Sequence, residues 1–208
     1  MMRDIDFDML DRGRQARNYR TITQTIALAD QGNVILDPFS TLIATDAVIG
    51  TGNVLYPNTT FTAATPGTVC IGNGNVFYPG TAITATTGKI SIGNDNLFGE
   101  GSVCIATNRV GADIIIGSHV RFRGFIDIGD TCHLGDGCQI LGQISAANVG
   151  LGAGGSFAHP IADERGAVLK GHGHAADIRL ETGQVIAGDG RFTHADMRMQ
   201  SHYHPEAT

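Results

Sequence analysis

The sequence predicts an all-β fold, a parallel β-helix of hexapeptide repeats with a short N-terminal helical arm and an irregular C-terminal cap. Six pairs of an aliphatic residue and glycine each open a run of about six residues, namely Ile49-Gly50, Ile71-Gly72, Ile92-Gly93, Ile116-Gly117, Leu134-Gly135 and Leu151-Gly152. Further hexapeptides continue in frame between these pairs, for example the six residues that begin at Leu55 and at Phe77. The pairs are spaced by 22, 21, 24, 18 and 17 residues, close to three hexapeptides. Three hexapeptides therefore form one coil.

Each face of such a coil needs an inward column of apolar side chains. The first column contains Ile49, Ile71, Ile92, Ile116, Leu134 and Leu151. The second contains Leu55, Phe77, Phe98, Phe122, Ile140 and Phe157, and the third contains Phe61, Ile83, Cys104 and Ile128. Because Ile128-Gly129 also fits the first column, the alignment can shift by one hexapeptide after residue 116. The sequence leaves that choice open.

Small and amide residues recur at the fifth position of the first hexapeptide in each coil. They are Asn53, Asn75, Asn96, Val120, Cys138 and Gly155. A buried amide without a partner costs about 1–3 kcal/mol, whereas stacked asparagines can bond to their copies in neighbouring coils. Glycine at the second position permits a close corner that a Cβ would obstruct. We therefore expect an asparagine ladder beside one corner of the coil.

Three segments follow from the repeat. Residues 1–30 contain five arginines and five aspartates, with Ile22, Ile26 and Ala29 at helical spacing, and we expect a helical arm that covers the first coil. Residues 31–159 form the β-helix. Residues 160–208 lose the hexapeptide pattern, and the runs at Asp177 and Gln184 flank Glu181-Thr-Gly183 in the manner of a hairpin. This tail is expected to cap the last coil or to contact a neighbouring subunit.

Composition narrows the classes of function. The chain has 29 glycines, no tryptophan and a net charge of −6, which argues against a nucleic-acid partner. It contains no apolar run near 18 residues, and its N-terminus lacks the hydrophobic core of a signal peptide, so we expect a cytoplasmic protein without a membrane span. The four cysteines, Cys70, Cys104, Cys132 and Cys138, form no CxxC pair and are interpreted as reduced core residues.

The aliphatic-glycine hexapeptides resemble those of the left-handed parallel β-helix family of acyltransferases. The stretch from Gly32 to Thr60, with its Asp-Pro pair, Ile-Gly pair and Tyr-Pro-Asn, is similar to the start of the acetyltransferase domain of the bifunctional N-acetylglucosamine-1-phosphate uridyltransferase/glucosamine-1-phosphate acetyltransferase family. About thirty residues carry this closer resemblance. The resemblance implies a left-handed coil, which is a known exception to the right-handed crossover rule.

The resemblance also implies a homotrimer in which acetyl-CoA, or another acyl-CoA, lies in the groove between neighbouring β-helices. A histidine there acts as general base on a small-molecule acceptor, because imidazole exchanges a proton near neutral pH. The family's Lys-x-x-His-Leu-Ser-Tyr run is missing from this sequence. We therefore expect a sugar, sugar nucleotide, small amine or hydroxyl acceptor other than glucosamine-1-phosphate.

Two histidines are the candidate catalytic bases. His119 stands where other coils carry glycine or aspartate, so its side chain must project outward from a corner, and His133 lies at a similar turn-like position. His159 is a third histidine of this kind, and all three can equally be solvated corner residues. The candidate residues for the phosphates of the cosubstrate are Arg109, Arg121 and Arg123. They can equally form an exposed basic patch.

Other functions stay open at this stage. Five histidines, His172, His174, His194, His202 and His204, invite a metal interpretation, but their spacing matches no known closed site. The γ-class carbonic anhydrases share the left-handed β-helix, although their His-x4-His spacing does not occur in this sequence. A non-catalytic β-helix that binds or assembles partners is the main alternative to the acyltransferase.

Overall fold

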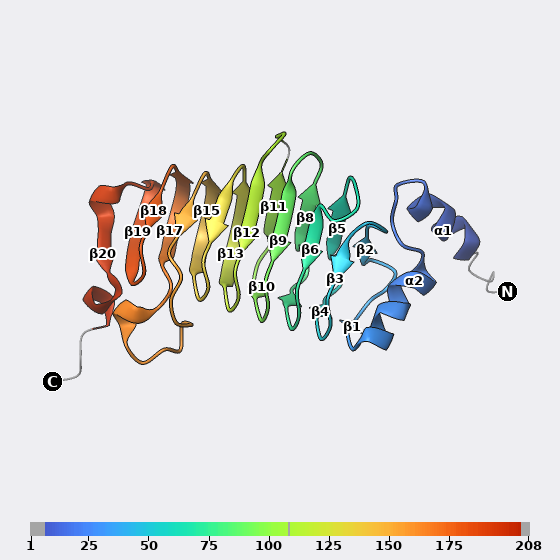
Figure 1. Ribbon diagram of the computed structural model, residues 1–208, viewed down its shortest axis with the longest axis horizontal. Coiled ribbons are helices and arrows are strands. Elements are labelled where there is room, and N and C mark those ends of the chain that lie inside the picture. The colour runs from blue at the N-terminus through green and yellow to red at the C-terminus, as the bar shows by residue number, and fades with distance from the viewer. Residues whose placement is uncertain (1–6, 108, 205–208) are drawn as a thin grey trace.

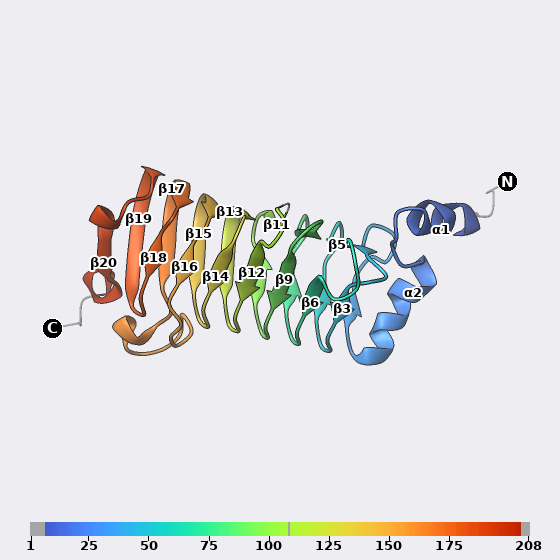
Figure 2. The ribbon, with the colours of Figure 1, turned by 45° about the horizontal axis from the view of Figure 1, so that its top comes forward.

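The chain winds into an elongated solenoid of parallel strands, seen in a computed structural model that describes residues 7–107 and 109–204. Helices cover one end of the solenoid and a short antiparallel strand with 3-10 turns covers the other (Figures 1 and 2). The strands stack into ladders in which each strand pairs with its counterpart in the next coil. This pattern is a parallel β-helix-like fold with three faces to each coil.

Face 1 is a seven-stranded sheet. Its strands are β3 (Val48–Ile49), β6 (Val69–Ile71), β9 (Lys89–Ile92), β12 (Asp113–Ile116), β14 (Cys132–Leu134), β16 (Gly150–Leu151) and β18 (Arg179–Leu180). Face 2 begins with β1 (Val34–Ile35), β4 (Val54–Leu55), β7 (Val76–Phe77) and β10 (Leu97–Gly99). Face 3 begins with β2 (Leu42–Ile43), β5 (Thr60–Ala63), β8 (Ala82–Ala85) and β11 (Val103–Thr107).

In the later coils, faces 2 and 3 are made by single strands that bend. These strands are β13 (Arg121–Gly129), β15 (Gln139–Ala147), β17 (Val168–Ala176) and β19 (Gln184–Arg191). The bends stack at Gly124, Gly142 and Gly171, whose φ angles are 109°, 125° and 116°. A Cβ at Gly142 would lie 2.0 Å from the carbonyl oxygen of Gly171. Only glycine therefore suits this bend.

The strand register confirms the first predicted column and extends it by one coil. Ile49 pairs with Ile71, the pairing continues residue by residue to Leu151, and Leu151 then pairs with Leu180. The alternative shift after residue 116 is wrong, because Ile128 pairs with Ile105 on face 3. The period of the hydrophobic pattern was therefore sufficient to predict this face.

The predicted core positions of Phe157 and Cys104 are wrong. Phe157 is 50% exposed in the segment between β16 and β17, and Leu169 takes its place beside Ile140. Glycines at 154 and 155 and a proline at 160 favour irregular backbone in this segment, although the six-residue spacing fits.

Cys104 faces outward on β11, and Ile105 fills the third column. The corner before β11 contains Glu100 and Gly101, both at positive φ, so this coil is one residue longer there. A shift of one residue reverses every side chain on a strand. The prediction for the cysteines holds only in part: all four are unpaired, but only Cys132 and Cys138 are buried.

The predicted asparagine ladder is confirmed and begins one coil earlier, at Asn33. Asn75 is representative: its Nδ2 donates to Asn53 Oδ1 and to the carbonyl oxygen of Gly93, both at 3.0 Å. Its own Oδ1 accepts a hydrogen bond from the backbone N–H of Asn96. The side chains of Asn53, Asn75 and Asn96 are almost fully buried. The ladder thus satisfies backbone groups at the same corner in successive coils.

At the N-terminal end the described helices are α1 (Phe7–Gln15), α2 (Ile22–Ile26) and the 3-10 helix η1 (Ala27–Gln31). Residues 1–6 of the expected arm lie outside the described residues. Thr21 caps α2 through a hydrogen bond from Gln24 N–H, and the Gln24 side chain accepts from Thr21 N–H in return. None of the described helices is both long and apolar enough to cross a membrane.

The expected hairpin around Gly183 is wrong, and the coils continue beyond residue 159. The two segments lie on successive faces of one coil, β18 beside β16 and β19 beside β17, both in parallel register. Gly183, with a φ of 75°, turns the corner between them. The end is capped instead by β20 (Met197–Met199), which pairs antiparallel with β19. Short 3-10 helices, η2 (Ala162–Glu164), η3 (His194–Asp196) and η4 (Gln200–Tyr203), complete this cap.

Candidate functional site

The two histidines predicted as bases lie on the outside of the coil, as expected for corner and outward positions. His119 follows β12 with a φ of 58°, and its side chain is exposed. His133 is exposed in the middle of β14 on face 1. Neither imidazole has a hydrogen-bond partner among residues 7–107 and 109–204. Their catalytic role stays a prediction.

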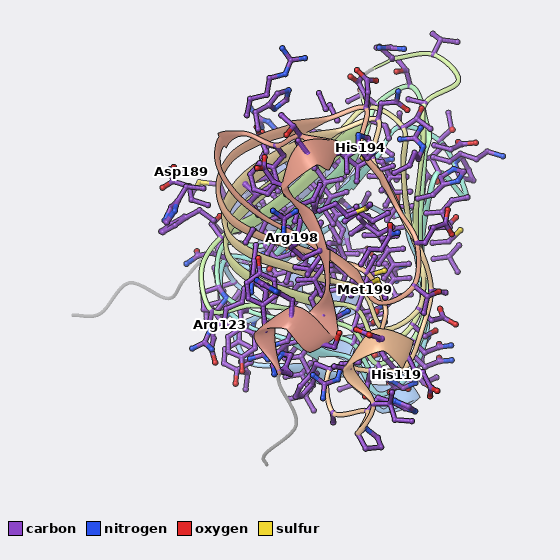
Figure 3. The ribbon with its side chains drawn as sticks, turned by 90° about the vertical axis from the view of Figure 1, so that its left-hand side faces the viewer. His119, Arg123, Asp189, His194, Arg198 and Met199 are labelled. Carbon is purple, nitrogen blue, oxygen red and sulfur yellow. The ribbon has the colours of Figure 1, made fainter. Side chains whose placement is uncertain are left out.

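The three predicted arginines do not form one cluster. Arg109 forms an ion pair with Asp130 at 3.2 Å, and Arg123 pairs with Glu100 at 2.6 Å. The guanidinium of Arg121 lies 4.8 Å from the centre of the Phe157 ring. Arg123 and His119 lie at separate places around the cross-section (Figure 3). Each of the three guanidinium groups thus contacts another side chain of the protein.

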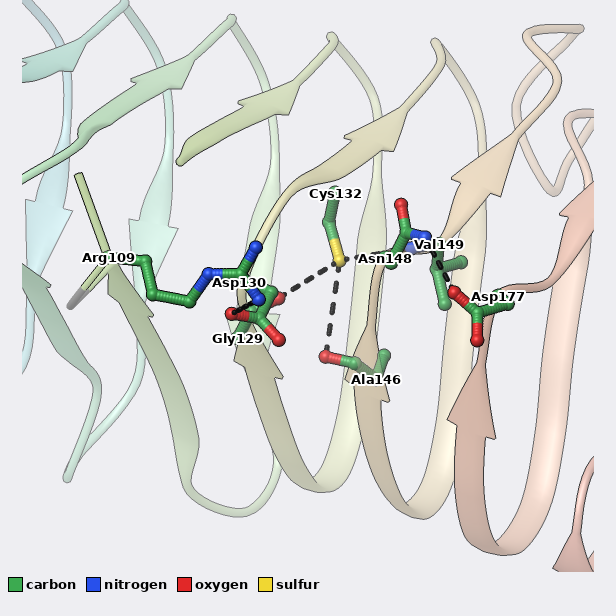
Figure 4. A network of polar contacts seen from close by, with 8 residues as sticks. All are labelled: Arg109, Gly129, Asp130, Cys132, Ala146, Asn148, Val149 and Asp177. Atoms are coloured by element: carbon green, nitrogen blue, oxygen red, sulfur yellow. Dashed lines mark hydrogen bonds and ion pairs between the residues drawn. The ribbon is translucent and has the colours of Figure 1, made fainter. Parts of the chain in front are cut away.

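Arg109 belongs to a polar network along the corner between faces 3 and 1 (Figure 4). In the next coils Asn148 donates to Asp177 at 2.6 Å, and both residues, like Asp130, have positive φ. The buried Cys132 thiol donates to the Gly129 carbonyl oxygen at 3.3 Å, and burial raises the pKa of this thiol. These contacts fix the turns, which is a structural role for the corner.

An open groove of about 790 Å³ runs along face 3 and is called the face 3 groove below. Its lining residues are Ser102, Cys104, Phe125, Ile126, Asp127, Gln143, Ile144, Ser145, His172, Gly173, Asp189 and Gly190. Apart from Ser102, which precedes β11, they come from β11, β13, β15, β17 and β19, beyond the glycine bend in the last four strands. A cavity of this size with convergent polar groups is typical of a ligand site.

Strand register places the polar groups of the groove in two neighbouring outward columns. One column runs from Phe125 through Gln143 and His172 to Asp189. The other runs from Cys104 through Asp127 and Ser145, which line the groove, to His174 and Arg191 beyond the lining. Members of a column lie about 4.8 Å apart because the strands do.

Ser145 lines the groove and contacts His174, which follows the lining residues His172 and Gly173 at the edge of the groove. The Ser145 Oγ lies 2.7 Å from His174 Nδ1, and either atom can donate, depending on the imidazole tautomer. Ser145 is half-buried and His174 is exposed, so His174 Nε2 is left for a ligand. No described residue hydrogen-bonds to His174 Nε2. An imidazole fixed on one nitrogen and accessible on the other is suited to proton transfer.

His174 lies in the part of the chain that was expected to be an irregular tail, and Ser145 was not among the predicted site residues. The signal that could have placed both is the repeated glycine at each bend, followed three residues later by Asp127, Ser145 and His174. Ser145 and His174 are 29 positions apart, because the segment 152–167 lies between them and hides the repeat.

The remaining histidines do not assemble a metal centre in the described part of the chain, where no three potential ligands of the His, Cys, Asp and Glu types converge. His194 Nε2 lies 3.1 Å from the Arg179 carbonyl oxygen. His159 lies near Glu164, with Nε2 and Oε2 3.6 Å apart.

Comparison with known proteins adds no family to this description. No protein-family model matches the chain, and no curated protein sequence matches it.

Proposed function

We propose that this chain is a CoA-dependent acyltransferase that works in the face 3 groove with His174 as general base. The observation that carries the proposal is the 2.7 Å contact between Oγ of Ser145, which lines the groove, and Nδ1 of His174 at its edge. The resemblance of the hexapeptides to those of acyltransferases supplies the reaction class, and fold analogy is its only source. The proposal includes a left-handed coil, a homotrimer and a cytoplasmic location, as the resemblance implies.

In the proposed reaction Ser145 Oγ accepts a hydrogen bond from His174 Nδ1–H, which orients the imidazole. Nε2 takes the proton from the acceptor hydroxyl or amine as its oxygen or nitrogen attacks the thioester carbonyl. A new C–O or C–N bond forms, the C–S bond breaks, and the thiolate of CoA takes the proton back from the imidazolium. The acceptor is a sugar, sugar nucleotide or small amine.

The proposal transfers the base from His119 and His133 to His174 for a geometric reason. His119 follows a strand of face 1 and His133 lies on one, so neither is beside the groove on face 3, and neither has a partner among the described residues that would orient its ring. His174 has such a partner. General base catalysis contributes about 10²–10⁴-fold, and it depends on a fixed position.

The test measures acetyl transfer from acetyl-CoA to a panel of amino sugars and small amines by mass spectrometry. We expect His174→Ala to lower kcat by about a hundredfold or more, and Ser145→Ala to lower it by about tenfold. The matched control is His133→Ala, an exposed histidine outside the groove, which should retain full activity. Full activity in His174→Ala would exclude His174 as the base.

A non-catalytic assembly module is the second candidate, and one surface favours it. Face 2 presents an outward column of apolar side chains in the early coils, Val34, Val54, Val76 and Leu97. Val34 is 48% exposed. If the wild-type chain neither binds acetyl-CoA at millimolar concentration nor transfers acetyl groups, this column becomes the principal functional surface.

A further inference from the structure

A second cavity of about 260 Å³ lies on face 2 under the C-terminal cap, and is called the cap pocket below. Its lining residues are Gln139, Leu141, Phe157, Arg165, Val168, Lys170, Val185, Gln200, Tyr203 and His204. The floor comes from β15, β17 and β19, before their glycine bend, and the walls come from the segment 152–167 and from η4. The cap pocket thus uses the same strands as the face 3 groove but a different face.

Hydrogen bonds hold the walls of the cap pocket together. The Gln200 side chain is buried, and its Nε2 donates to the Gly166 carbonyl oxygen at 2.8 Å. The backbone N–H of Gln200 donates to Gly183, and that of Ser201 donates to Asp163 Oδ1 at 2.7 Å. These bonds fix η4 over the segment 152–167, so the pocket is formed before any ligand arrives.

The charged side chains at the cap pocket are positive. Arg165 and Lys170 line it, and none of the other described residues that line it is a carboxylate. Neither of these cations has an ion-pair partner among the described residues. The two acidic residues beside Arg165 are engaged elsewhere, Asp163 with Ser201 N–H and Glu164 with His159.

The ammonium group of Lys170 has N–H donors left for a ligand. Its Nζ lies 3.4 Å from the centre of the Tyr203 ring, a contact that occupies one side of the ammonium group. Burial lowers the pKa of Lys170, because the charged form loses hydration. A charged group that is partly desolvated and lacks a counter-ion gains free energy when an anion binds.

Apolar side chains complete the cap pocket. Leu141, Val168 and Val185 form its floor, and the ring of Phe157 lies at its side, covered by the guanidinium of Arg121. The volume is slightly below the usual range of about 300–1,000 Å³ for ligand pockets. A ligand that fits must therefore be small and must join an anionic group to a short apolar body.

We propose that the cap pocket binds a small organic anion, a carboxylate or phosphate monoester on a short apolar body, through Lys170 and Arg165. The site is independent of acyl transfer in the face 3 groove. The anion satisfies the two cations, and the apolar body lies against Leu141, Val168 and Val185.

The experiment is calorimetric titration of the full chain with benzoate, phenyl phosphate, inorganic phosphate and benzyl alcohol. We expect benzoate or phenyl phosphate to bind, and benzyl alcohol to bind at least tenfold more weakly because it lacks the charge. Lys170→Met should weaken anion binding about tenfold or more, and Lys170→Arg should restore most of it.

Lys89→Met is the matched control, because Lys89 is the other lysine of the chain and is exposed on β9, away from the cap pocket. It should leave binding unchanged, and so should His174→Ala, which separates this site from the proposed catalytic one. The proposal is overturned if neither organic anion binds at about 10 mM. Equal binding to the wild type, Lys170→Met and Arg165→Gln would also overturn it.

Discussion

Single asparagines solve a hydrogen-bonding problem that recurs in every early coil. The corner leaves a carbonyl oxygen, such as that of Gly93, and a backbone N–H, such as that of Asn96, and one buried amide satisfies both. In a later coil Cys138 stands in the same column, and its thiol donates to the Gly152 carbonyl oxygen at 3.2 Å. Burial raises the pKa of Cys138 to about 12, so the thiol keeps the proton that it donates.

Asn75→Ala should lower the free energy of unfolding by about 3 kcal/mol, because it leaves the Gly93 carbonyl oxygen and the Asn96 N–H without partners in a buried corner. Urea denaturation followed by circular dichroism measures this loss. Asn73→Ala is the control: Asn73 also lies in a stacked amide ladder, but it is exposed, so water replaces its bonds. Equal losses for the two variants would show that burial does not set the cost.

The bent strands determine where functional groups can gather. In β15 and β17 the glycine bend separates the half that forms the floor of the cap pocket from the half that lines the face 3 groove. Stacked glycines at positive φ let the strand turn without losing its ladder. The element is therefore a nine-residue strand with two outward surfaces.

Gly142→Ala tests this bend. We expect it to lower the free energy of unfolding by about 3 kcal/mol or more, because the added Cβ would lie 2.0 Å from the Gly171 carbonyl oxygen and the φ of 125° is strained for any L residue. Gly129→Ala, with open space around the added Cβ, should cost less than about 1 kcal/mol. Thermal unfolding of both variants measures the difference, and a small loss in Gly142→Ala would mean that the bend can relax.

These elements were predictable only as far as the hexapeptide spacing held. The first column followed from the period alone, because an inward column cannot drift without exposing apolar side chains. The outward position of Cys104 did not, since one extra residue at the Glu100–Gly101 corner reverses the strand. The prediction that Phe157 is a core residue failed for a different reason: its spacing is regular, but its backbone is part of a loop.

At the scale of the molecule the solenoid is a one-dimensional stack in which each coil contacts its neighbours. The contact between Ser145 and His174 exists only because β15 and β17 stack, although 29 residues separate the two side chains in the chain. Such a pair becomes visible only once the later coils are aligned, and the segment 152–167 hides that alignment, so the sequence predicted the scaffold and not the groove. The two ends of the stack need covering, because the strands of a terminal coil have no further coil to pair with.

Arg14 connects the helical arm to the first coil. Its side chain is 7% exposed and donates to the carbonyl oxygens of Pro38 and Phe39 at 2.8 Å, and to that of Thr41 at 3.3 Å. Burial lowers the pKa of Arg14, so these acceptors must compensate for lost hydration. The arm thus stabilises the corner between β1 and β2.

Arg14→Met should open the first coils while leaving the later ones closed. The substitution retains an apolar stem but leaves three carbonyl oxygens unpaired, and in a solenoid such a loss acts mainly on neighbouring coils. Hydrogen exchange measured by mass spectrometry should show at least tenfold faster exchange in β1 and β2 and unchanged exchange in β13 and β15. The exposed Arg17→Met is the control and should leave exchange in β1 and β2 unchanged. Faster exchange in all coils together would instead mean that the solenoid unfolds as one cooperative unit, and that the arm stabilises the whole stack.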